Sequence, residues 1–124
     1  MEKTTILLKQ MVQAIIDGDE LLMRESEQTI WRLNLSLDKI AEPSLDNPLE
    51  YVLTACILKE MNNVWQQKGR EGFNVPRWAM ESPSLVQGYS VISAKDIAFW
   101  ENEECNKVFI AHNIFAPENY LIFY

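Results

Sequence analysis

The amino-acid sequence predicts a mostly α-helical fold, a compact single-domain helical bundle with an irregular strap that contains proline and tryptophan. Three observations support this prediction. Apolar residues recur with helical spacing in the first half of the chain, cap residues stand where those helices would begin and end, and prolines interrupt the second half. The 124 residues suit one domain with a sizeable core, and no repeat, low-complexity tract or Gly- or Ser-rich linker divides residues 1–124.

Two helices are predicted near the N-terminus. The first covers residues 3–17, where aliphatic residues at helical spacing form one wide apolar face. In the sequence DGDE that follows, Gly18 can adopt the left-handed conformation that ends a helix, and Asp19 can begin the next one. The second helix extends to about Leu35, and so short a link predicts an antiparallel hairpin. Its candidate core residues are Leu21, Leu22, Ile30, Trp31 and Leu33.

The third helix has the clearest start signal in the chain. Asn47 is a suitable N-cap, Pro48 occupies the first helical position, and the Glu50 carboxylate can reach back to the cap. The helix should extend from Pro48 to about Lys68, where Gly69 follows. One face would carry Leu49, Leu53, Ile57, Met61, Val64 and Trp65.

The second half of the chain is less regular. Two prolines in FNVPRWAMESPS predict an extended strap, which Phe73, Val75 and Trp78 would hold against the helices. The segment LVQGYSVIS could be briefly extended. Ser93 and Asp96 form a second capping-box pattern, which predicts a helix over residues 97–100.

The chain ends in HNIFAPENYLIFY, an unusually apolar and aromatic tail. We predict that Pro117 opens a final turn and that Tyr120, Leu121 and Phe123 fold back over the helical hairpin as part of the core. Burial of one such side chain contributes ~1.5–3 kcal/mol, which can offset the ~1–2 kcal/mol needed to order its backbone. In the alternative, part of the tail stays exposed and forms a homodimer or partner contact.

The charge balance restricts the classes of partner. Eleven basic and eighteen acidic residues give a formal net charge of −7, which disfavours nucleic acid and anionic membranes and suits a basic protein. Lys9 and Gln10 interrupt the N-terminal apolar run, so no signal peptide is expected, and no segment approaches the ~20 apolar residues of a membrane span. Cys56 and Cys105 form no Cys-x-x-Cys motif and are expected to be reduced. The expected compartment is the cytoplasm.

The sequence carries few residues in patterns typical of catalysis. The chain has one histidine, His112, and lacks the nucleophile-elbow, Walker A and dinucleotide-binding motifs. We therefore expect no catalytic residues, metal site or cofactor. The alternative is a small enzyme or ligand-binding domain, in which Cys105 and His112 come together on two turns of a helix beside the acidic run ENEE.

The same acidic run is the best candidate for a partner-binding surface. ENEE follows Phe99 and Trp100, and acidic groups next to an aromatic residue can receive an Arg or Lys side chain; a solvated turn is the alternative. Trp31 and Trp65 are expected in the core, whereas the two other tryptophans stand beside charged residues and could be partly exposed anchors. The predicted partner-binding residues are Trp78, Trp100, Glu101, Glu103, Glu104, Tyr120 and Phe123.

The segments NPLEYVL, VPRW and HNIFAPENYL resemble a loosely defined group of uncharacterised small bacterial helical proteins that have a Pro-x-Trp strap and a C-terminal Asn-Ile-Phe segment. The resemblance covers roughly Asp46 to Leu121. It implies a cytoplasmic bacterial or phage protein encoded beside nucleotidyltransferase-like or toxin–antitoxin components, and it supplies no catalytic residue. The group has basic residues before Asn-Ile-Phe, where this chain has Ile110, Ala111 and His112. The expected function is therefore an acidic protein-interaction module, of the antitoxin, immunity or regulatory-subunit type, for a basic partner from an adjacent gene.

Overall fold

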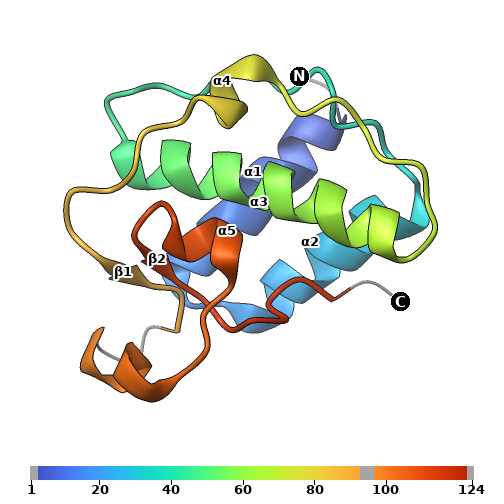
Figure 1. The fold of residues 1–124 in the computed structure, drawn as a ribbon. Coiled ribbons are helices and arrows are strands. Elements are labelled where there is room, and N and C mark those ends of the chain that lie inside the picture. The colour runs from blue at the N-terminus through green and yellow to red at the C-terminus, as the bar shows by residue number, and fades with distance from the viewer. Residues whose placement is uncertain (1–2, 93–96, 123–124) are drawn as a thin grey trace.

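The computed structural model describes residues 3–92 and 97–122, in which helices predominate, and the prediction of a mostly α fold is confirmed (Figure 1). Two short strands form a small parallel sheet, in which Tyr89 pairs with Ile114 and Ser90 with Phe115. The elements are α1 (Lys3–Asp17), α2 (Glu20–Arg32), α3 (Pro48–Gln67), α4 (Arg77–Met80), β1 (Tyr89–Ser90), a 3₁₀ helix (Ile97–Asn102), α5 (Lys107–Ile110) and β2 (Ile114–Phe115). None of the helices in the described ranges is long and apolar enough to cross a membrane.

Helices α1 and α2 form the predicted hairpin. Gly18 has φ +74°, a left-handed conformation that glycine adopts at little cost, and the Asp19 carboxylate accepts a hydrogen bond from the Leu22 amide at 3.1 Å. The prediction that Leu21 and Leu33 contribute to the core is wrong, because their side chains are 72% and 48% exposed. The buried face of α2 carries Met23 and Ile30; Leu21 lies across the helix from it, and Leu33 follows the last helical residue.

Helix α3 begins as predicted. Asn47 Oδ1 accepts from the Glu50 amide at 3.2 Å, and the Glu50 carboxylate lies 3.3 Å from Asn47 Nδ2. The helix crosses the middle of the molecule, and α1, α4 and α5 pack against it (Figure 1). Residues 51–58 are consequently all buried, so the predicted single apolar face was too narrow.

The strap also packs as predicted. Phe73, Val75 and Trp78 are partly buried against the core, and Trp78 Nε1 donates a hydrogen bond to the Ile40 carbonyl at 3.0 Å. The extended segment predicted in LVQGYSVIS forms only as the two residues of β1. Residues 97–102 form a 3₁₀ helix where an α-helix was predicted, and the proposed cap residues Ser93 and Asp96 lie outside the described residues.

The C-terminal tail folds back over the hairpin, as predicted. Tyr120 and Leu121 are buried, and the Tyr120 ring packs edge-on against Phe109 with 5.6 Å between centroids. Helix α2 holds this segment through polar contacts, because Arg24 Nη1 donates to the Tyr120 carbonyl and the fully buried Glu27 carboxylate accepts from the Ile122 amide. Phe123 lies outside the described residues.

Candidate functional site

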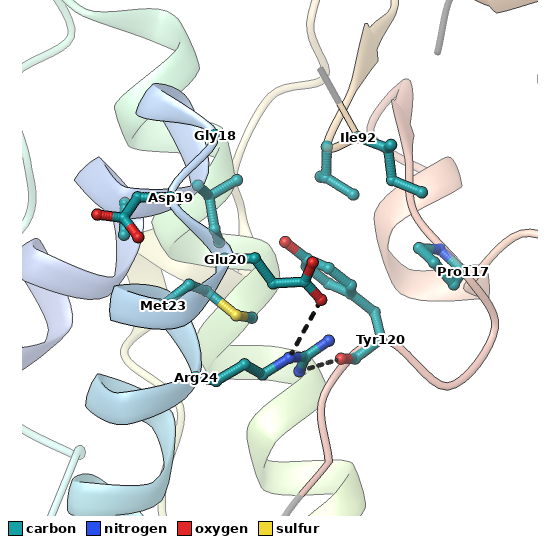
Figure 2. Close-up of a pocket in the computed structure, with 11 residues that line it drawn as sticks. Gly18, Asp19, Glu20, Met23, Arg24, Ile92, Pro117 and Tyr120 are labelled. Atoms are coloured by element: carbon teal, nitrogen blue, oxygen red, sulfur yellow. Dashed lines mark hydrogen bonds and ion pairs between the residues drawn. The ribbon is translucent and has the colours of Figure 1, made fainter. Parts of the chain in front are cut away.

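A cavity of about 250 Å³ lies between the α1–α2 turn and the C-terminal segment, and we call it the hairpin cavity (Figure 2). The hairpin supplies one wall and the segments before the 3₁₀ helix and after β2 supply the other. Most of the lining side chains are apolar, so the cavity can receive an apolar group from outside. The lining residues are Ala14, Ile15, Gly18, Asp19, Glu20, Met23, Arg24, Val91, Ile92, Pro117 and Tyr120.

Arg24 and Tyr120 form the polar part of this cavity. The Arg24 guanidinium lies 5.4 Å from the centre of the Tyr120 ring, and its Nη1 donates to the Tyr120 carbonyl at 2.6 Å (Figure 2). Glu27 is 3.1 Å from Nη1 and Glu20 is 3.9 Å from Nε, so two carboxylates balance the one positive charge. Burial raises the pKa of Tyr120 above its ordinary value, which keeps the phenol neutral. Arg24 is thus engaged within the protein and leaves no excess positive charge for an anion.

Two carboxylates line the hairpin cavity, and two more lie beyond Pro117 of its opposite wall. Asp19 and Glu20 are exposed on the hairpin wall. On the other wall, Pro117 pairs with Cys105 in an isolated β-bridge, which brings the acidic run next to the exposed Glu118. The pKa of Glu118 is raised by a hydrogen bond to Glu104 and by the charge of Glu104. Glu104 and Glu118 do not line the hairpin cavity itself, and Glu118 lines a separate cavity against α3. Asp19, Glu20, Glu104 and Glu118 are called the acidic rim below.

The predicted partner-binding residues differ in their exposure to solvent. Glu101, Glu103 and Glu104 are exposed, as a docking surface requires. Tyr120 is buried, and it lines the hairpin cavity together with Pro117. Phe123 is outside the described residues.

Trp78 and Trp100, the two tryptophans predicted to bind a partner, are not exposed anchors of this site. Trp100 is only 5% exposed, its Nε1 donates to Ser90 Oγ at 2.9 Å, and its ring lies against Phe115, so it is a core residue of the sheet region. Its neighbour Phe99 is the more exposed aromatic. Trp78 is a residue of α4 and joins it to the Ile40 carbonyl and the Tyr51 ring. Figure 1 shows α4 on the far side of α3 from the 3₁₀ helix. The site therefore excludes Trp78.

The structure does not bring Cys105 and His112 together on a helix. Helix α5 spans only Lys107–Ile110, so Cys105 precedes it and His112 follows it. Cys105 Sγ lies 3.8 Å from the Glu103 carbonyl, and burial raises the pKa of the Cys105 thiol, which makes it a poorer nucleophile. His112 instead contacts Lys59 and Pro83. The alternative in which the two side chains meet on a helix therefore does not hold, because α5 ends at Ile110.

His112 is expected to make stability depend on pH. Burial lowers the pKa of His112 from 6.5 and the charge of Lys59 lowers it further, whereas the bond to Pro83 acts in the opposite direction. A lowered pKa in the folded state means that this stabilisation is complete above pH 6.5 and is lost as the pH falls through the folded-state pKa. Urea unfolding between neutral and mildly acidic pH should show the loss, and His112→Gln, which can keep both hydrogen bonds without titrating, should reduce it. An unchanged pH dependence in His112→Gln would contradict this assignment.

No group of three or more His, Cys, Asp or Glu side chains within the described ranges is placed to hold a metal ion. No family model matches the sequence, and neither the curated proteins nor the solved structures that were compared with the chain include a match.

Proposed function

We propose that this chain is an acidic cytoplasmic protein-interaction module that binds a more basic protein, as an antitoxin, immunity-type or regulatory subunit does. The observation that supports it most is the hairpin cavity with its acidic rim. The net charge of −7 attracts a basic protein over longer distances and would speed its association with this chain.

A basic side chain fits this arrangement chemically. Arg and Lys carry an apolar stem that can enter a cavity while the charged head remains at its mouth. Glu104 raises the pKa of Glu118 through a hydrogen bond and its charge, so a cation placed beside them would relieve a repulsion that exists in the free protein. The partner would therefore present an Arg- or Lys-rich surface.

The direct experiment mixes the chain with the product of the adjacent gene and measures the mass by size-exclusion chromatography with light scattering. A stable complex at micromolar concentration is the expected result, and its affinity should fall with added salt. The double variant Glu104→Gln/Glu118→Gln should weaken binding by at least ~10-fold, on the scale of electrostatically steered association.

A charge-matched control separates the acidic rim from net charge. Glu25→Gln/Glu71→Gln removes two exposed carboxylates that do not belong to the acidic rim and should change the affinity much less. If both double variants weaken binding equally, the acidic rim is not the docking site. If the chain elutes alone and monodisperse in the presence of the neighbouring gene product, that protein is not its partner; a mass of two copies would indicate the homodimer instead.

A further inference from the structure

A second cavity, of about 270 Å³, lies between α3 and the segments that contain α4 and α5, and we call it the Lys59 cavity. Lys59, Asn62 and Asn63 project into it from α3, since residues three and four apart share one face of a helix. Val75 of the strap, Met80 of α4 and His112 after α5 are among the residues of the opposite walls. None of them belongs to the hairpin cavity.

The imidazole of His112 orients Lys59. His112 Nδ1 lies 3.1 Å from the Pro83 carbonyl, which can only accept, so Nδ1 carries the hydrogen and donates. The other ring nitrogen, Nε2, then presents a lone pair to Lys59 Nζ at 2.5 Å. This contact uses one of the three donor positions of the ammonium group.

Lys59 has no negatively charged partner in the described part of the chain. The ion pairs there join Arg24 to Glu20 and Glu27, and Arg77 to Glu81. Lys59 is half-buried, and an ammonium group that is partly withdrawn from water is favoured by a nearby negative charge. An anion in the cavity would supply that charge.

Asn62 adds a second donor with a defined orientation. Its Oδ1 accepts a hydrogen bond from the Phe73 amide at 2.8 Å, which leaves Nδ2 as the group without a hydrogen-bond partner among the described residues. The strap approaches so closely here that a Cβ on Gly72 would collide with the Asn62 and Gln66 side chains. Backbone packing thus holds the Asn62 amide in place.

Apart from Asn63, whose amide donates to the Glu60 carboxylate at 3.4 Å, the rest of the wall is apolar. Val75, Val108 and Ala111 contribute aliphatic surface, and Met80 is 60% exposed although it lines the cavity. Methionine is flexible and polarisable, so an exposed one beside a cavity can adjust to an apolar ligand. The Lys59 cavity therefore combines one cation and the uncommitted amide donor of Asn62 with an aliphatic wall.

We propose that the Lys59 cavity binds a small aliphatic carboxylate, with its carboxylate on Lys59 Nζ and Asn62 Nδ2 and its alkyl chain against the Val75–Met80 wall. A single ammonium group with one amide suits a singly charged carboxylate better than a phosphate, which calls for more donors or an arginine fork. A cavity of about 270 Å³ has room for a short-chain acid.

The test titrates the ¹⁵N-labelled full chain with sodium acetate, butyrate and hexanoate and follows the Asn62 side-chain amide and the His112 ring by NMR. Sodium chloride at the same concentrations controls for ionic strength. We expect saturable shifts at both groups, and an affinity that rises about fourfold per added methylene, the ratio expected for burial of a CH₂ group. Shifts that sodium chloride reproduces, or that do not depend on chain length, would overturn the proposal, as would the absence of saturable shifts.

Two variants test the named donors. Lys59→Met keeps the length of the side chain and removes its charge, and should weaken butyrate binding at least tenfold. Asn62→Asp keeps the acceptor for the Phe73 amide but places a carboxylate beside Lys59, and should weaken binding to a similar extent without loss of the strap contact. Lys39→Met makes the same charge change at an exposed position outside the cavity and should bind butyrate like the unaltered chain. Normal butyrate binding by Asn62→Asp would overturn the proposal even if Lys59→Met failed to fold.

Discussion

Replacement of Glu27 by alanine is expected to lower the free energy of unfolding by about 3 kcal/mol, because it breaks a buried ion pair and leaves the Ile122 amide without its acceptor. The Glu27 carboxylate is fully buried and accepts from Arg24, from Gln28 and from the Ile122 amide. Burial raises the pKa of Glu27 while these contacts oppose the shift. Urea unfolding would measure the loss, and hydrogen exchange at the Ile122 amide would report whether the tail separates from α2.

Two further variants make the Glu27 result interpretable. Glu25→Ala removes an exposed glutamate from the same helix and should change the stability by less than ~0.5 kcal/mol. Glu27→Gln keeps the volume, but its amide nitrogen would face groups that are donors, so an intermediate loss is expected. A Glu27→Ala protein as stable as Glu25→Ala, with the Ile122 amide still protected, would show that this carboxylate does not hold the tail.

Replacement of Asn106 by alanine should cost a similar amount, about 3 kcal/mol, as the sum of a lost helix cap and lost hydrogen bonds to a charged group. Asn106 is buried, and its Oδ1 accepts from the Val108 and Phe109 amides at the start of α5. Its Nδ2 donates to the Glu60 carboxylate on α3 and to the Glu118 carbonyl in the C-terminal turn. Urea unfolding followed by tryptophan fluorescence is a suitable measurement.

A second substitution separates the contribution of the Asn106 helix cap from that of its hydrogen bonds to Glu60 and Glu118. Asn106→Ser retains a good cap side chain but cannot reach Glu60 and Glu118 as the amide does, so it should recover about 1 kcal/mol of the loss. Asn102→Ala, at an exposed asparagine of the 3₁₀ helix, is the control. If alanine and serine at position 106 both behave like Asn102→Ala, the contacts of Asn106 do not join α3 to the C-terminal segment.

The candidate site was only partly predictable. The acidic run was identified from the sequence, and so was the packing of Tyr120 against the hairpin, but the hairpin cavity was not, because its walls come from residues 14–24, 91–92, 117 and 120. Glu27 was missed although the sequence contains a signal for it: it lies between Met23 and Ile30 on the apolar face of α2, where a carboxylate must find partners. Trp100 was misjudged because a charged neighbour in sequence says little about burial in a 3₁₀ helix.

The sequence by itself determined the three long helices, the caps that begin α2 and α3, the strap and the return of the tail. These depend on local spacing, cap chemistry and apolar content, which act within a few residues. Only the tertiary structure decided the pairing of β1 with β2, the burial of Glu27 and the contact of Lys59 with His112, 53 residues apart. Those features arise when distant segments share one core, and the free energy that selects them comes from packing and from the need to pair buried polar groups.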